Sequence, residues 1–355
     1  MLFGRRVLFA LSTGVGLLVG PVGASWAIGG TLHAWGGDVS GQVSEAPAGS
    51  NFTAIAAGTG HGLALDTDGR IHAWGNDASG QVSGAPAGTN FIAIAAGEVS
   101  SLALNGAGSI VGWGADRSGV LSGAPSASGL VAVQLGAQGP APGADPTTPL
   151  GSFGVALDMN GEIHAWGSDA MGQVTDAPTG TGFTAISCGG MHCLALHSGG
   201  AVSAWGWDSG GLVSDTPTGV SFASVAAGLL SSLAIGGRVG AIEAWGAGHG
   251  GGGPPPGGGY RAIASGAAHS LAIDASGAIR GWGLDLSGEV SSAPSGTGFV
   301  EVAAGTYWSL ALQRNAQTVP SLTIPRTLAL VVLLVGIVGF PKLSLAKWLT
   351  SRVSR

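Results

Sequence analysis

Short apolar segments alternate with polar turns along most of the chain, and the alternation recurs about every 40 residues. One copy has apolar segments at residues 52–57 and 62–66, an alternating polar and apolar segment at 70–74, and a short polar segment near Gln81. Gly, Asp, Asn and Pro residues separate these segments, as is typical between strands. The pattern predicts an all-β chain with four short strands in each repeat.

The dipeptide Trp-Gly marks every repeat. Successive copies are 37 to 40 residues apart, except for one interval of 53. A period of about 40 residues is typical of one four-stranded blade of a β-propeller. Small residues in the first segment suit the crowded centre of a propeller, and indole rings suit the space between blades. The seven residues are Trp35, Trp74, Trp113, Trp166, Trp205, Trp245 and Trp282.

The two ends of the repeat region complement each other. The pattern begins at Gly30 with the third segment of a repeat and ends near Leu312 after the second segment of another. Strands from both ends would therefore complete one shared blade and leave no open edge. We predict a seven-bladed propeller of ~39-residue four-stranded blades at residues 28–313, with its last blade closed by both termini.

The repeats resemble those of the regulator of chromosome condensation family. The shared pattern is Ala-Ala-Gly-x-x-His-x-Leu-Ala-Leu, then Asp-x-Asp-Gly-x-Ile-x-Ala-Trp-Gly, then Asp-x-x-Gly-Gln. The match is closest to the shorter, exported bacterial branch, which includes a propeller inhibitor of β-lactamases. The resemblance implies the propeller fold and suggests protein binding, but it transfers no contact residue, because this fold supports several functions.

The charge of the repeat region opposes nucleic-acid binding. Residues 28–313 contain all 19 acidic residues and only five arginines, which gives a formal charge of −14. Such a surface repels phosphate backbones. A role in nucleotide exchange, which the eukaryotic branch of the family would suggest, is opposed by the lack of a basic face.

The N-terminus has the pattern of a secretory signal peptide. Arg5 and Arg6 precede an apolar stretch at residues 7–20, and small residues near Ala24 and Ala27 suit cleavage. We therefore assign residues 1–27 to a signal peptide and expect an exported protein without a cofactor, located at the cell surface or in the periplasm.

The C-terminus resembles the three-part tails that exosortase-type enzymes process. Residues 314–327 form a linker with the motif Val-Pro-Ser-Leu at 319–322, close to the Ile-Pro-Thr-Leu variant of such signals. Residues 328–346 are expected to form a transmembrane or sorting helix, and 347–355 a basic cytoplasmic tail. The tail predicts a membrane anchor, or release after processing by a sorting enzyme.

Cysteine and histidine residues recur at positions that favour structural roles. Cys188 and Cys193 flank a predicted hairpin turn and could form a disulfide in an oxidising compartment, although free thiols or a metal site with nearby histidines remain alternatives. Most histidines occupy two repeated positions, whereas a catalytic group is normally unique. We therefore predict neither a catalytic residue nor a metal site.

One face of the predicted propeller carries the candidate binding residues, because the first turn and the loop after the third strand open on the same side. An acidic series follows the Trp residues by three positions and forms either turn caps or a ring of carboxylates able to attract cations. The series comprises Asp38, Asp77, Asp116, Asp169, Asp208 and Asp285.

The same face has residues that break the repeat. A loop insertion at 137–152 accounts for the interval of 53 and is either a binding element or a neutral insertion. Aromatic and apolar residues in the turns are typical anchors at protein interfaces. The predicted partner-binding residues are Glu98, Met191, Trp207, Leu229, Leu230, Tyr307 and Trp308.

These features predict a non-catalytic exported propeller that binds a protein or glycan partner at the cell surface through its insertion-bearing face. The alternative is an extracytoplasmic hydrolase or lyase that uses the mouth of the central channel. Partner capture and turnover of a glycan panel would distinguish the two functions.

Overall fold

The structure is a computed structural model in which residues 9–12, 15–17, 29–137, 151–237, 239–248 and 252–314 are described. The described residues form strands and turns, with two single-turn 3-10 helices, η1 (Arg117–Gly119) and η2 (Ser209–Gly211). Contacts divide the chain into Met1–Asn315 and Ala316–Arg355, and every described residue belongs to the first unit. The all-β class predicted from the sequence is confirmed.

The strands form six sheets built from three-stranded antiparallel meanders. Four meanders are separate sheets: β7 (Phe91–Ala96), β8 (Ser100–Asn105) and β9 (Ile110–Gly114); β10 (Leu130–Ala137), β11 (Ser152–Asp158) and β12 (Ile163–Gly167); β16 (Phe222–Ala227), β17 (Ser232–Gly236) and β18 (Ile242–Trp245); β19 (Ala262–Ser265), β20 (His269–Ile273) and β21 (Ile279–Gly283).

The two remaining sheets contain additional strands. The meander of β13 (Phe183–Cys188), β14 (His192–His197) and β15 (Val202–Gly206) is extended by β1 (Phe9–Ser12), which pairs in parallel with β13, and by β2 (Val15–Leu17). The six-stranded sheet contains the meander of β4 (Phe52–Ala57), β5 (His61–Asp66) and β6 (Ile71–Gly75), and the meander of β22 (Phe299–Ala304), β23 (Trp308–Arg314) and β3 (Gly30–Gly36). A single pair, Gly30 with Phe52, joins its two meanders.

The predicted pairing of the two ends of the repeat region is present. Strand β3 runs antiparallel to β23, with Gly36 opposite Trp308 and Gly30 opposite Arg314. We call β22, β23 and β3 the closure unit, because it combines strands from both ends of the repeat region.

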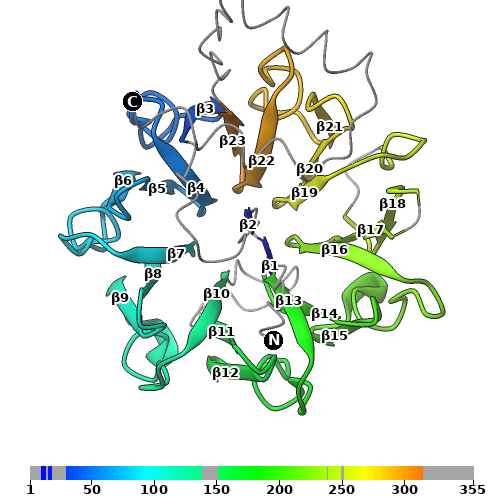
Figure 1. Cartoon of the computed structure of the whole chain (residues 1–355), viewed down its shortest axis with the longest axis horizontal. Helices are drawn as coiled ribbons and strands as arrows, with labels where there is room; N and C mark the ends of the chain where they lie inside the picture. The colour runs from blue at the N-terminus through cyan, green and yellow to red at the C-terminus, as the bar shows by residue number, and fades with distance from the viewer. Residues whose placement is uncertain are drawn as a thin grey trace, which may run out of the picture. The chain divides into compact units, whose positions relative to one another are not determined.

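The sheets are arranged radially around a common axis, with the first strand of each meander innermost (Figure 1). Each innermost strand contacts the innermost strand of the next meander, and β22 contacts β4. The ring of neighbours is therefore continuous from the first complete meander to the closure unit.

The core lies between neighbouring sheets. Ala54 and Ala56 of β4, for example, pack with Ile94 and Ala96 of β7. The buried indole rings connect successive repeats, because their Nε1 donates a 2.7–3.0 Å hydrogen bond to a main-chain oxygen of the preceding repeat. The donors are Trp35, Trp74, Trp113, Trp166, Trp205 and Trp245.

The prediction of four strands in each repeat is wrong for the described residues, in which the fourth segment is a turn. The amide of Gly84 donates to the carbonyl of Gly80, and the carboxylate of Asp77 accepts the amides of Val82 and Ser83. These short-range bonds satisfy the main chain of the segment locally, so it needs no fourth ladder.

Several sequence predictions lie wholly or mostly outside the described residues. These are the signal peptide at 1–27, of which only β1 and β2 are described, the insertion at 137–152, of which 138–150 are not described, and the linker, helix and basic tail from 314 onward, of which only Arg314 is described. Within the described part of the chain, no helix has the length and apolar character needed to cross a membrane.

Candidate functional site

One hydrogen bond in each repeat joins the first turn to the loop after the third strand. The amide before the acidic position donates to a carbonyl of the first turn at 2.7–2.9 Å, as Trp207 does to Met191 and Gly37 does to Tyr307. The two loops therefore lie on one face, as predicted. We call the first turns and these loops together the Asp rim. The remaining donors before an aspartate are Asn76, Ala115, Ser168 and Leu284, and in the repeat without an aspartate the donor is Gly248, at the acidic position itself.

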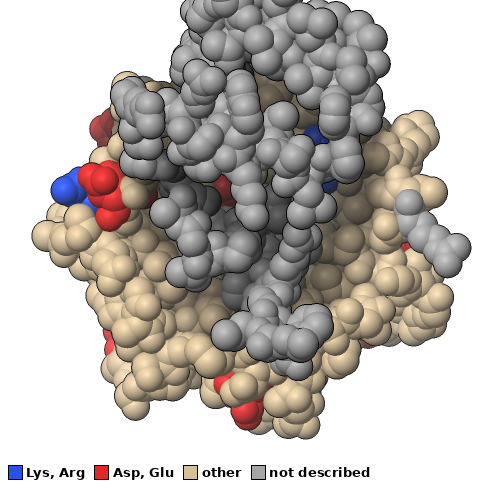
Figure 2. Space-filling model, viewed as in Figure 1, with Lys and Arg blue, Asp and Glu red and all other residues tan. Residues whose placement is uncertain are grey.

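The acidic series of the Asp rim caps the turns. Each carboxylate accepts the amides five and six residues later at 2.7–3.3 Å. The hydrogen bond from the sixth residue is the main cause of the lowered pKa of each carboxyl. All six carboxylates are exposed, so they also form a negatively charged border. On the one face of the molecule that Figure 2 draws, acidic side chains form small separate groups, one of them beside a basic side chain.

The predicted aromatic pair of the closure unit has two different roles. Tyr307 is 50% exposed on the Asp rim, whereas Trp308 is fully buried. The Trp308 ring packs with Ala57 and Leu310, and its Nε1 donates to the carbonyl of Gly58 at 3.0 Å. The prediction that Trp308 is an exposed anchor is therefore wrong, because its ring fills the junction between β23 and the neighbouring repeat.

The other predicted anchors also differ in exposure. Trp207, Leu229 and Leu230 are half-buried on the Asp rim, so part of each side chain faces solvent. Met191 is 3% exposed and belongs to the core, which makes it unsuitable as an anchor. The apolar character of a turn residue did not reveal whether its side chain points inward.

Glu98 forms an ion pair on the same rim. Its carboxylate lies 3.1 Å from the guanidinium of Arg117, which follows Asp116 in the next loop of the same repeat. The side chains are 24% and 40% exposed, so the pair remains accessible to solvent. Such exposed pairs contribute little to stability, and Glu98 remains a candidate contact residue.

Sequence reasoning missed three exposed apolar residues that flank acidic positions of the Asp rim: Val39, Leu284 and Leu286, which are 97%, 40% and 75% exposed. They directly precede or follow an acidic position in the series. Comparison of these two positions across repeats could have identified them, because the other repeats mostly have small or polar residues there.

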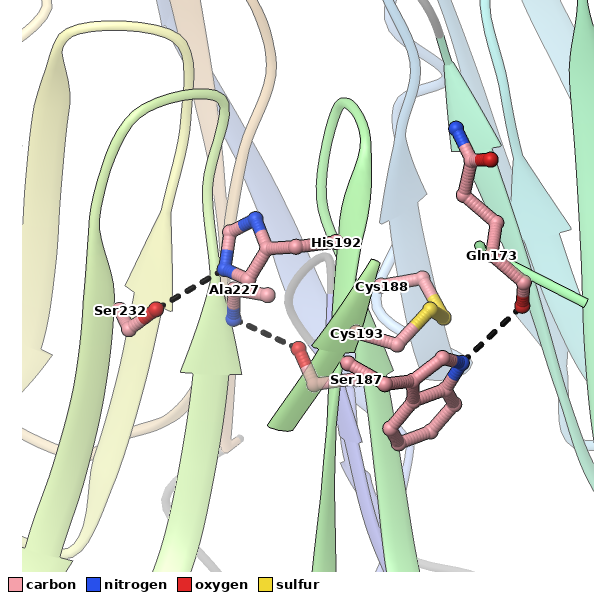
Figure 3. Close-up of a disulfide and its surroundings, with 8 residues drawn as sticks. Gln173, Ser187, Cys188, His192, Cys193, Ala227 and Ser232 are labelled. Atoms are coloured by element: carbon pink, nitrogen blue, oxygen red, sulfur yellow. Dashed lines mark hydrogen bonds between the residues drawn. A yellow bond between two sulfur atoms is a disulfide. The ribbon is translucent and has the colours of Figure 1, made fainter. Parts of the chain in front are cut away.

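The three buried histidines connect neighbouring repeats. Nε2 of His61, His192 and His269 lies 2.9 Å from the hydroxyl of Ser101, Ser232 and Ser309, respectively. Burial lowers the pKa of each histidine to about 4. Their repeated position and their serine partners support the structural role predicted from the sequence (Figure 3).

Cys188 and Cys193 form a disulfide across the β13–β14 pair, with their Cα atoms 4.2 Å apart. Figure 3 shows the bond beside the indole whose Nε1 donates to the carbonyl of Gln173. Ser187 lies next to it on β13, and its hydroxyl accepts the amide of Ala227 on β16 at 2.6 Å. The disulfide alternative of the sequence analysis is therefore present, and the thiols are not available as metal ligands.

A cavity of about 270 Å³ opens at the axis on the Asp rim. Its lining consists mainly of Ala and Gly from the first turns, and Glu98 is its only ionisable lining residue among those described. An acid and base pair of the kind that hydrolases use needs a second group. The described lining therefore does not favour the hydrolase or lyase alternative.

One cluster away from the Asp rim has the composition of a metal site. Ligand atoms of Asp158, Glu162 and His164 lie within 4.8 Å of one another at the hairpin between β11 and β12. Asp158 already accepts the amides of Asn160 and Glu162 at 2.8 and 2.9 Å, as its counterparts Asp66 and Asp274 do in their hairpins. The repeated turn accounts for this carboxylate without a metal ion.

Comparisons with known proteins agree with this architecture. Residues 52–81 match the model of the regulator of chromosome condensation (RCC1) repeat. No curated protein matches the sequence.

Three solved structures illustrate the similarity of fold. Prp20p from Saccharomyces cerevisiae is 18% identical, with 81% of this chain and 92% of that chain covered and a TM-score of 0.61. Human WBSCR16 is 16% identical, covers 81% and 100%, and has a TM-score of 0.62. The ectodomain of the Arabidopsis thaliana receptor kinase ACR4 is 19% identical, covers 75% and 92%, and has a TM-score of 0.58. Together with the repeat match, they identify the fold of this chain as an RCC1-like β-propeller.

Proposed function

We propose that this chain is an exported, non-catalytic, seven-bladed propeller that binds a protein partner at the cell surface through its Asp rim. The observation that carries the proposal is the exposure of large apolar side chains on that rim. Tyr307 and Leu286 remain at least half exposed although buried tryptophans already fill the spaces between sheets. Exposed aromatic and aliphatic residues beside polar groups are typical of protein-binding surfaces.

Two solved structures of one neighbour, yeast Prp20, support protein binding as the general role. The structure of Prp20p was described together with its binding to Gsp1p and histones, and another structure shows Kap60 bound to yeast RCC1. At sequence identities of 18% and 17% to this chain, these structures indicate the fold but identify no contact residue. The choice of the Asp rim therefore rests on the side chains of this chain.

The blade count rests on the meanders and on their ring of contacts. Each innermost strand contacts that of the following meander, and β22 contacts β4. With the two meanders of the six-stranded sheet counted separately, the described strands form seven meanders, one for each proposed blade. Their agreement with seven Trp-Gly repeats supports this count.

Export is supported by the signal-like N-terminus, the sorting-like tail and the disulfide. A Cys188–Cys193 bond is stable in an oxidising compartment, and such bonds are rare in the cytosol. We propose a location at the cell surface or in the periplasm, with membrane attachment through residues 328–346 or release after tail processing.

A photo-crosslinking residue at position 207 or 307 of the full chain tests the function in its native cell. We expect discrete adducts with one protein from both positions. The matched control is Met159, which is 70% exposed in the β11–β12 hairpin. The amide of Phe183 donates to the carbonyl of Gly161 in that hairpin. The hairpin therefore lies beside the start of β13, away from the Asp rim. Protein adducts from position 159 alone, or adducts with glycans alone, would contradict the proposal.

A further inference from the structure

Four exposed apolar side chains gather on one sector of the Asp rim. Val39 is 97% exposed, Leu286 75%, Tyr307 50% and Leu284 40%. They belong to the closure unit and to the meander of β19, β20 and β21, which are neighbours in the ring. We call these four residues the apolar patch.

The main chain brings the four residues together. The amide of Gly37 donates to the carbonyl of Tyr307 at 2.7 Å, and a Cβ on Gly37 would lie 3.5 Å from that of Ser287. The loop with Val39 therefore lies between Tyr307 and the loop with Leu286. The amide of Leu284 donates to Ala268, and that of Ala267 to Gly305, at 2.9 and 3.4 Å, so the two first turns also meet.

The equivalent positions of other repeats show that the fold does not require large apolar residues there. The residue after the acidic position is Val39 or Leu286 in the patch, but small or charged elsewhere: Ala78, Arg117, Ala170 and Ser209. All six loops keep the same carboxylate caps regardless of this neighbour. Val39 and Leu286 are therefore additional to the packing of the propeller.

Negative charge flanks the apolar patch. Asp38 precedes Val39, and Asp285 lies between Leu284 and Leu286. Hydrogen bonds from Ser44 and Val43, and from Ser291 and Val290, lower the pKa of these two carboxyls, so both are ionised at neutral pH.

The described arginines do not neutralise these carboxylates. Arg70, Arg117 and Arg280 pair with Asp68, Glu98 and Asp274, respectively. A partner that covers the patch with apolar groups alone would bring Asp38 and Asp285 into a less polar environment without compensation. Basic side chains beside its apolar groups would compensate this charge and accelerate association.

We propose that the apolar patch docks a segment of a separate protein in which aliphatic or aromatic side chains are flanked by Lys or Arg. The proposal rests on the proposed function and specifies the sector and the partner chemistry. The chain's own residues 316–355 also combine an apolar run with basic residues. The experiment must therefore distinguish an external segment from this tail.

The test places a photo-crosslinking residue at position 286 of the full chain and maps the crosslinked peptide by mass spectrometry. We expect a segment of another protein with Lys or Arg next to its apolar residues. A Val39→Ala/Tyr307→Ala variant and an Asp38→Asn/Asp285→Asn variant should each lower the yield roughly tenfold. Met159→Ala is the matched control and should leave the yield unchanged. Val39→Ala/Tyr307→Ala and Met159→Ala should retain the melting temperature of the parent, and Asp38→Asn/Asp285→Asn should stay folded at the temperature of the assay.

Each other result overturns the inference. A crosslinked segment without basic residues, or an unchanged yield in the Asp38→Asn/Asp285→Asn variant, contradicts the proposed chemistry. A crosslink to residues 316–355 shows an intramolecular contact instead. Adducts from position 207 but none from position 286 overturn the docking sector while the proposed function survives, whereas no adduct from any Asp rim position overturns both.

Discussion

The meander β13–β15 and the closure unit have the same strand order but use equivalent positions differently. In the first, His192 lies 2.9 Å from Ser232 of the next repeat, whereas the closure unit has Trp308 at the same position, with its Nε1 on the carbonyl of Gly58. At the residue before, Met191 is buried while Tyr307 is half exposed. A residue that differs from the repeat pattern can therefore pack in the core or lie exposed where a partner could bind, and its burial distinguishes the two cases.

The residue type at one position of the following repeat varies together with the residue at the His192 position. His61, His192 and His269 each face a serine in the next repeat, whereas the equivalent position in the repeat after Trp308 is Gly62, and in the repeat after Phe153 it is Cys193. Phe153 has no hydrogen-bonding group, and the Nε1 of Trp308 donates to the carbonyl of Gly58, so neither ring needs a serine hydroxyl as its partner. The serine can therefore be replaced by a residue that packs or forms a disulfide.

The largest expected effect comes from Trp308. Trp308→Ala should lower the free energy of unfolding by about 3–5 kcal/mol, because it leaves a cavity in a fully buried site and removes the donor to Gly58. Urea unfolding measures the loss. Tyr307→Ala is the control next to it and should change stability by less than about 0.5 kcal/mol. Equal losses in both variants would contradict the conclusion that Trp308 stabilises the core whereas Tyr307 does not.

The second prediction concerns the pH dependence of the histidine-containing repeats. Burial lowers the pKa of His61, His192 and His269 to about 4, whereas an unfolded histidine titrates near its ordinary value of 6.5. Between these pH values the unfolded chain binds more protons than the folded one. Their stabilising effect is therefore fully present above pH 6.5 and is lost as the pH falls towards 4.

The closure unit should show the opposite sign. Glu301 on β22 is 3% exposed, and burial raises the pKa of its carboxyl well above the ordinary value, although the amide of Ile55 donates to it at 3.1 Å. This group disfavours folding as the pH rises above 4.5, so it offsets part of the histidine effect.

Urea unfolding between pH 4 and 7 separates these contributions. His192→Gln should lower the slope of stability against pH by up to about 1.4 kcal/mol per pH unit. Glu301→Gln should make the slope steeper. An unchanged slope in His192→Gln would mean that this histidine does not lose its proton on folding.

The third prediction concerns the disulfide. The double variant Cys188→Ala/Cys193→Ser introduces the residue types that the next repeat has at the equivalent positions, Ala227 and Ser232. We expect a loss of roughly 2 kcal/mol in the free energy of unfolding, because a bond over a sequence separation of 5 removes little entropy from the unfolded chain. A reductant should destabilise the parent by a similar amount and leave the double variant unaffected. A reductant effect on the variant would assign the loss to something other than this bond.

The smallest expected effect comes from the acidic caps. Asp208→Ala and Asp38→Ala should each cost about 1 kcal/mol in chemical unfolding, because each carboxylate satisfies two main-chain amides. Equal losses would show that the cap is the same in a regular repeat and in the closure unit. Partner binding should then separate the two variants, with only Asp38→Ala weakening the contact at the apolar patch.

The sequence by itself determined the all-β class, the repeat and the meeting of both ends. The period of the Trp-Gly positions and the half-repeats at each end depend only on spacing along the chain, which is why β3 was expected beside β23. The common face of the first turns and acidic loops was equally predictable, because it depends on the order of the strands.

Only the tertiary structure decided which side chains face inward. Tyr307 and Trp308 are adjacent in the sequence, but β23 begins at Trp308, so its ring packs into the junction between repeats while Tyr307 stays in the turn. The fourth predicted strand became a turn because nearby amides found the carboxylate of Asp77 and local carbonyls. Val39 and Leu286 lie close together only because Gly37 brings their loops together across two repeats, and this contact depends on the pairing of β3 with β23.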